Sequence, residues 1–203
     1  MPEINTKHME KNMTPEESLK VIESMIGQAK RSFSSMSFYF LLWGVLLICA
    51  MITTYVLRDE PRSVSQGAVW AVAGILGGVV SSVHGIREGK RNRVSNPMDR
   101  VIGWLWSAFV ITMVITIIVS VGHHRDPGPM ITLITGFATF LTGQILRFRP
   151  LIIGGILFWA IGAAMHFTHD VLITSVLYCC AMLFGYIVPG LMLKHQENVL
   201  RTT

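Results

Sequence analysis

Six long apolar runs dominate the sequence and leave few folds open to it. A helix needs about 20 mostly apolar residues to cross about 30 Å of hydrocarbon, and because lipid offers backbone polar groups no partner, such runs must be helical. The sequence therefore predicts an all-α polytopic membrane bundle, with six transmembrane helices arranged as three helical hairpins and the lipid bilayer as partner. The six runs cover roughly 37–57, 67–86, 101–121, 130–146, 151–167 and 171–193.

Composition and cysteine placement agree with this fold class. Half of the residues (51%) are hydrophobic and only 14% are charged, which is too little charge to cover a soluble domain of this size. Cys49, Cys179 and Cys180 all lie inside apolar runs, and no pair has CxxC spacing. The pattern predicts apolar filler, with neither a disulfide nor a zinc site.

The positions of lysine and arginine predict the orientation in the membrane. Cytoplasmic loops carry an excess of these residues, and 14 of the 17 lie on the side of the N-terminus if the chain crosses six times. We therefore expect a multi-pass membrane protein with both termini in the cytoplasm, and no nucleic-acid partner. The other side carries Arg58, Arg62 and Arg125. The cytoplasmic set is Lys7, Lys11, Lys20, Lys30, Arg31, Arg87, Lys90, Arg91, Arg93, Arg100, Arg147, Arg149, Lys194 and Arg201.

The segment before the first run has its own organisation. Residues 1–13 are polar and predict a disordered tail, whereas Thr14, Pro15 and Glu17 form a helix start with a capping box. Apolar residues then recur every three or four positions, which predicts a cytoplasmic amphipathic helix over 14–36. That helix either lies on the inner leaflet or under the bundle, or it docks a cytoplasmic protein. The stripe comprises Leu19, Ile22, Met25 or Ile26, Ala29, Phe33 and Met36. Residues 37–193 then form the transmembrane domain, and 194–203 form a cytoplasmic tail.

The second run carries two stripes of small residues, each spaced one turn apart. Such stripes let helix backbones approach closely. Two uses stay open: packing inside the bundle, or a homo-oligomer interface. One stripe is Gly74, Gly78 and Ser82, and the other is Gly77, Ser81 and Gly85.

Hydroxyl side chains follow one face of the third and of the fourth run. They can bond the carbonyl one turn back, so polar packing between helices is the simpler use, and a wall of a solute path is the alternative. No Asp, Glu, Lys or Arg lies in the middle of a run, which argues against an ion-coupled pump. The third run carries Thr112, Thr116 and Ser120, and the fourth carries Thr132, Thr135, Thr139 and Thr142, with Gln144 near its end.

Histidine is the one residue type that offers candidate chemistry. His123 and His124 follow the third run, and His166 and His169 follow the fifth, so all four are expected at the outer face. Imidazoles at this spacing are ligands that zinc or copper accepts. The alternative is a solvated loop, in which Asp170 caps the next helix. His84 is isolated and predicts a satisfied packing histidine.

No hydrolase, zinc-protease, Walker or dinucleotide motif is present, so we expect neither an enzyme nor a cofactor. The leading hypothesis is a non-enzymatic integral membrane protein, structural or regulatory, with residues 14–36 and the basic 87–100 loop presented to the cytoplasm. One alternative is a small transporter or channel for a neutral or amphipathic solute. The other is an outer-face metal- or pH-sensing protein.

Aromatic and glycine residues open the odd runs at Phe40–Gly44 and Gly154–Trp159, and basic residues close the even runs. In these features the chain resembles small six-span bacterial inner-membrane proteins built from three helical hairpins, such as the acid-resistance membrane protein family. Thr14–Ser18 and Phe38–Trp43 resemble uncharacterised bacterial membrane proteins of this size. Both resemblances imply a hairpin bundle in a bacterial inner (cytoplasmic) membrane, and neither supplies a residue of known role.

Overall fold

The computed structural model describes the backbone of residues 15–59, 66–91, 97–168 and 170–202, and the side chains of 36–58, 67–90, 98–168 and 170–196. This part of the chain is built of helices joined by short turns, and it contains no strand. The fold class predicted from the apolar runs is therefore confirmed as all-helical. The predicted tail 1–13 and Thr14 lie outside the described residues.

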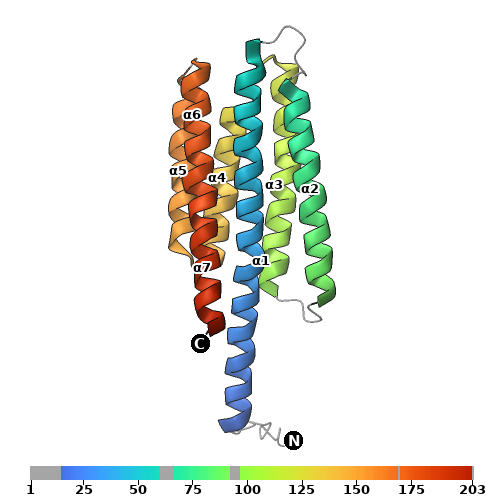
Figure 1. Cartoon of the computed structure of the whole chain (residues 1–203), viewed down its shortest axis with the longest axis vertical. Helices are drawn as coiled ribbons and strands as arrows, with labels where there is room; N and C mark the ends of the chain where they lie inside the picture. The colour runs from blue at the N-terminus through green and yellow to red at the C-terminus, as the bar shows by residue number, and fades with distance from the viewer. Residues whose placement is uncertain (1–14, 60–65, 92–96, 169, 203) are drawn as a thin grey trace, which may run out of the picture.

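The helices run up and down in one elongated bundle (Figure 1). They are α1 (Pro15–Val56), η1 (Leu57–Asp59), α2 (Gln66–Arg91), α3 (Pro97–Gly122), α4 (Gly128–Ile145), α5 (Arg149–His166), α6 (Val171–Met182), η2 (Leu183–Ile187) and α7 (Val188–Thr202). The last three follow one another without a break. The start of α1 and the end of α7 lie at the same end of the bundle.

Five of the described helical segments are long and apolar enough to cross a membrane, which is typical of a membrane-embedded protein. They are Met36–Val56, Gly67–Lys90, Met98–Gly122, Arg149–His166 and Val171–Gln196. Helix α4, the fourth of the six predicted spans, is not among them. Its 18 residues equal those of α5, so the difference lies in composition, because four threonines and Gln144 lower its hydropathy.

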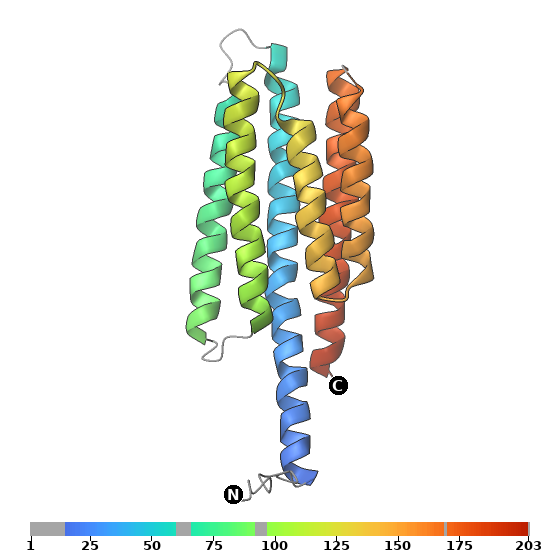
Figure 2. The ribbon, with the colours of Figure 1, turned by 180° about the vertical axis from the view of Figure 1, so that it is seen from behind.

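The prediction of a separate amphipathic helix before the first span is wrong. Helix α1 continues without interruption from Pro15 to Val56, over 42 residues. Gly27 is the one strong helix breaker between Pro15 and Met36, and once a helix is nucleated each further residue adds a hydrogen bond. Figure 2 shows that α1 extends well beyond the end of the other helices. A straight continuation of a membrane span cannot also lie flat on the inner leaflet.

Two predicted boundaries also change. The basic loop expected over 87–100 is shorter, because α2 extends to Arg91 and α3 begins at Pro97, so that Arg87, Lys90 and Arg100 lie on helices. The tail expected over 194–203 is helical through Thr202 as the end of α7. At the ends of both α2 and α7, the helix continues through polar residues beyond the apolar span. Helix α5 begins at Arg149, two residues before the expected run over 151–167, and it has Pro150 in its first turn.

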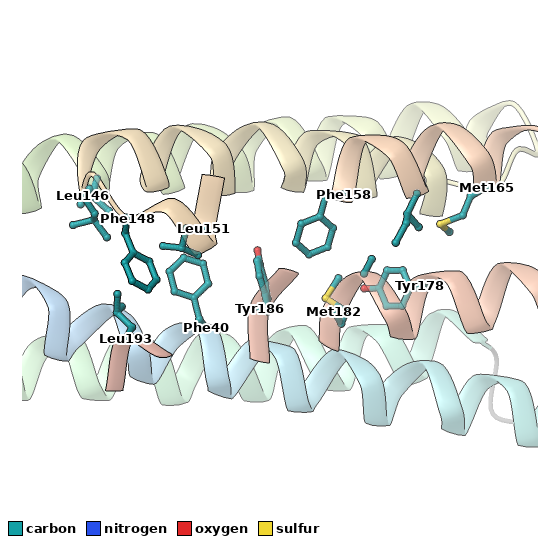
Figure 3. Close-up of a cluster of buried hydrophobic side chains, with 13 residues drawn as sticks. Phe40, Leu146, Phe148, Leu151, Phe158, Met165, Tyr178, Met182, Tyr186 and Leu193 are labelled. Carbon is teal, nitrogen blue, oxygen red and sulfur yellow. The ribbon is translucent and has the colours of Figure 1, made fainter. Parts of the chain in front are cut away.

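The core runs along the axis between α1, α5 and the last three helices (Figure 3). Phe158, Leu151 and Leu193 are fully buried in it. Helices α4 and α5 pack so closely that their glycines meet the opposite backbone. A Cβ atom on Gly155 would lie 2.6 Å from the backbone nitrogen of Phe140, and one on Gly143 would lie 2.7 Å from that of Ile152.

The last span contains a π-helical turn, Leu183–Ile187, shortly before Pro189. In this turn the amide of Val188 donates to the carbonyl of Leu183, five residues back. A proline in a helix removes one amide donor, and its ring clashes with the carbonyl four residues earlier, here that of Gly185. The wider turn relieves this clash, and it presents Gly185 to Phe158 of α5, whose ring leaves no room for a Cβ atom.

Candidate functional site

The extension of α1 leaves the bundle at a densely packed anchor. Phe40 of α1 is 3% exposed and packs edge-to-face on Tyr186 and Trp106, with ring centroids 5.2 and 6.1 Å apart. In Figure 3, Phe148 and Leu193 lie near Phe40, so side chains from α7 and the α4–α5 turn close this end of the core. The direction in which α1 leaves the bundle is therefore set by buried contacts.

Glycines bring α1 close to the last helices at the same level. A Cβ atom on Gly44 would lie 2.8 Å from Ile187, and one on Gly190 would lie 3.1 Å from Leu41. Small residues at such crossings let two helices approach closely. The resulting van der Waals contacts are a main source of attraction between helices in a membrane. Helix α1 is thus held against η2 and α7 on one side.

A polar and aromatic clamp holds α1 against α2 on its other side. The indole of Trp43 donates to the hydroxyl of Ser81 at 3.2 Å, and a Cβ atom on Gly77 would meet the Trp43 ring at 2.7 Å. Close by, the His84 ring stacks on Phe38 at 4.0 Å. The packing role predicted for His84 is confirmed, but the histidine is not satisfied, since its Nδ1 is buried with no hydrogen-bond partner in the described part of the chain.

The two stripes of small residues in α2 have different surroundings. Gly77, Ser81 and Gly85 face α1, so this stripe packs inside the bundle. Gly74 and Gly78 have nothing within 4 Å of a Cβ atom, and Ser82 is exposed. The homo-oligomer hypothesis is therefore confined to the stripe of Gly74, Gly78 and Ser82, where it stays a prediction.

Exposed basic side chains surround the base of the α1 extension. They lie at the helix ends that share this end of the bundle (Figures 1 and 2). Arg147 stands in the α4–α5 turn with φ at +52°, a conformation that favours glycine or asparagine. The described members of this group, all exposed, are Arg87, Lys90, Arg100, Arg147, Arg149 and Lys194. This end of the bundle therefore attracts anionic groups, on lipids or on proteins.

The threonine face of α4 is buried inside the bundle. Thr132, Thr139 and Thr142 are fully buried, and each hydroxyl donates to the carbonyl one turn back at 2.8 Å. Thr132 also contacts the sulfur of Met165 on α5 at 3.9 Å. On α3, Thr112 and Thr116 make the same backbone bonds. The predicted use in helix packing holds for α4, whereas a polar wall for a solute has no support from these hydroxyls.

The candidate metal ligands stand at the other end of the bundle. His123 and His124 are exposed after α3, with φ at +54° for His124, and His166 is exposed at the end of α5. His169 lies outside the described residues, and the described residues hold no group of three or more His, Cys, Asp or Glu that could bind a metal. The four-histidine site therefore stays a prediction.

Both aspartates beside these histidines serve the backbone. As predicted, Asp170 caps α6, accepting from the amides of Leu172 and Ile173 at 2.8 and 3.1 Å. Asp126 accepts from the amide of Gly128 at 2.9 Å, in the turn before α4. Because these carboxylates satisfy amides at helix starts, the turn geometry accounts for them without a metal.

The cysteines are free thiols, as predicted. Cys49 is exposed, and Cys179 and Cys180 are half-buried among apolar side chains.

No protein-family model, curated protein or solved structure matches this chain, so the interpretation of its surfaces rests on their own chemistry.

Sequence reasoning missed the glycine contact between α4 and α5. Gly136 and Gly143 on α4 and Gly155 and Gly162 on α5 each stand two turns apart, and all four meet the other helix. This matched spacing in two neighbouring runs was the available signal. Sequence reasoning also missed an apolar groove between α1 and α6. No local sequence pattern indicates this groove, because its walls come from opposite ends of the chain.

Proposed function

We propose that the chain is a non-enzymatic integral membrane protein, structural or regulatory, which uses the N-terminal part of α1 to dock a cytoplasmic protein. One observation carries this proposal: α1 is a single helix that extends past the end of the bundle (Figures 1 and 2). A rigid helix fixed at its base by buried contacts presents a defined face at low entropic cost.

The proposed docking face is the apolar stripe Leu19, Ile22, Ile26, Ala29 and Phe33, which continues through Met36 to Phe40. These positions alternate by three and four, and Phe40 and Trp43 extend the same register into the bundle core. A helix stripe of this kind recognises a groove or a second amphipathic helix. The basic residues around its base favour a partner with acidic groups beside that surface.

We further propose six crossings, with both termini in the cytoplasm of a bacterial inner membrane. Helix α4 lies alongside α5 in the same layer as the other spans, and its hydroxyls are internally bonded, which lowers their cost in lipid. An even number of crossings also agrees with the placement of both chain ends at one end of the bundle. The excess of Lys and Arg at that end favours the cytoplasm.

Site-specific photocrosslinking in cells tests the docking proposal. A photoreactive residue is placed at Ile22 or Phe33 on the apolar stripe, and at Lys20 or Arg31 on the opposite face of the same helix. We expect one discrete protein adduct from the stripe positions and none from the matched controls. Replacing Leu19 and Ile26 with Gln should abolish that adduct while leaving the amount of membrane-inserted protein unchanged. Crosslinks to lipid alone, or equal adducts from both faces, would contradict the proposal.

A further inference from the structure

An apolar groove lies along the contact between α1 and α6, in the half of the bundle away from the chain termini. Its volume is about 400 Å³. Helix α1 contributes Met51, Ile52 and Tyr55 to its walls, and α6 contributes Leu172, Val176 and Cys179. Ile52, Leu172 and Val176 are each about half exposed, so the groove is open along one side to the surroundings of the bundle.

The walls of this groove suit hydrocarbon and offer nothing to a polar solute. Two lining residues carry hydroxyls: Tyr55 stands at one end of the groove, and Ser175 already donates to the carbonyl of Val171 at 2.8 Å. Packed protein interiors hold few voids larger than a water molecule, because atoms that line an empty space lose their dispersion contacts. A gap of this size between two spans is therefore filled from the bilayer.

The size of the groove decides what fills it. An α-helix with its side chains is about 10 Å across, so a groove of about 400 Å³ is too small to seat a helix of a second copy. A flexible acyl chain fits. The walls extend about 10 Å along α1, from Ile48 to Tyr55, at about 1.5 Å per residue. That is about a third of the hydrocarbon thickness.

A cation stands at the end of the groove nearer the membrane surface. The guanidinium of Arg58 lies over the ring of Tyr55, 4.3 Å from its centroid, and Tyr55 is itself a wall residue. Tyrosine is enriched at membrane interfaces, at the level of the headgroups. An arginine presents five N–H donors in a fork that matches phosphate, so it can bind a phosphate beside other partners.

From these observations we propose that the α1–α6 groove is a lipid-binding site. One acyl chain of a phosphate-bearing membrane lipid fills the apolar walls, and Arg58 binds its headgroup phosphate. The site lies at the opposite end of the bundle from the docking helix and does not depend on it.

Native mass spectrometry of the purified protein tests this proposal, with dioleoyl-phosphatidylglycerol and dioleoylglycerol as probes. The two lipids share their acyl chains, and dioleoylglycerol lacks the phosphate. We expect the native protein to retain one phosphatidylglycerol and to bind it at least about tenfold more tightly than dioleoylglycerol, as one charge-assisted contact allows. Arg58→Gln should remove this preference, whereas Val176→Trp, which fills the groove, should abolish retention of both lipids.

The matched control is Ile118→Trp, which places the same bulk on an exposed position of α3 and should leave lipid retention unchanged. Met51→Trp fills the groove from the other wall and serves if Val176→Trp does not yield a monodisperse protein. Equal retention by the groove-filling and control variants would overturn the proposal. A change of oligomeric state in Val176→Trp without loss of lipid would also overturn it, since a second copy would then occupy the groove.

Discussion

The α4–α5 pair and the α2–α3 pair are built from similar apolar helices but serve different surroundings. The candidate span in α5 has a mean hydropathy of 1.4, and 39% of its residues are buried. The candidate span in α3 has a mean hydropathy of 2.3, and only 6% of its residues are buried. In a water-soluble protein the more apolar helix would be the more buried one. The reversed order indicates that α3 is solvated by lipid, and that α4 and α5 are held together by close backbone contact instead.

This difference explains where glycine matters. Between α4 and α5, glycines remove the side chain at points where the helices touch, so that dispersion contacts replace the hydrophobic effect as the source of cohesion. On α3, Gly103 has nothing within 4 Å of a Cβ atom. We therefore expect glycine to be essential between α4 and α5 and neutral on α3.

The largest effect should follow from Gly155→Leu. Its Cβ atom would lie 2.6 Å from the backbone nitrogen of Phe140, which cannot move without separating the two helices. We expect a loss above about 4 kcal/mol, which is a large share of the stability of a folded domain. Thermal unfolding in detergent, followed by size-exclusion chromatography, measures it. Gly103→Leu on α3 is the matched control and should behave like the native protein; a similar loss in both would refute the contrast.

A smaller loss should follow from Phe158→Ala. This ring is fully buried between α5 and the π-helical turn, and its removal leaves a cavity beside Gly185 and Tyr186. We expect about 3 kcal/mol, the usual cost of deleting a buried aromatic ring. Trp104→Ala removes a larger ring that is 72% exposed on α3, and it should cost less than about 0.5 kcal/mol. Equal losses for the two variants in titrations with a denaturing detergent would show that α3 is buried after all.

The smallest expected effect separates two adjacent residues of α2. Gly77→Leu must displace the Trp43 ring and should cost about 1–2 kcal/mol. Gly78→Leu meets open space and should leave the free energy of unfolding unchanged. A destabilisation by Gly78→Leu as large as that by Gly77→Leu would contradict the placement of α2. If Gly78→Leu instead converts a dimer to a monomer, a second copy covers the stripe of Gly74, Gly78 and Ser82.

Much of this architecture could be predicted from the sequence because the membrane imposes it locally. Apolar length marked five of the candidate spans, and Asp170 marked the start of α6. These signals act within one turn or one helix. The continuity of α1 could not be predicted in the same way, since a change from polar to apolar residues looks like a boundary even where the backbone continues unbroken.

The surfaces between helices were less predictable, because their partners are distant in sequence. Nothing near Gly77 or Gly78 in the sequence says that one faces Trp43 and the other faces outward. The groove between α1 and α6 is lined by residues near Tyr55 and residues near Val176, which are far apart in the sequence. It exists only because the fold places these two helices side by side. For the histidines, sequence spacing predicted a shared end of the bundle, whereas metal binding depends on ligand distances that spacing alone cannot give.

We propose that α4 crosses the membrane as a sixth span although its threonines make it the least apolar of the six. Reporter fusions along the chain test this directly, with alkaline phosphatase active outside the cytoplasm and green fluorescent protein bright inside. Fusions after Arg58 and after Arg125 should show phosphatase activity, and fusions after Lys90, Arg147 and the C-terminus should fluoresce. Phosphatase activity after Arg147 would mean that α4 does not cross, and it would contradict the account.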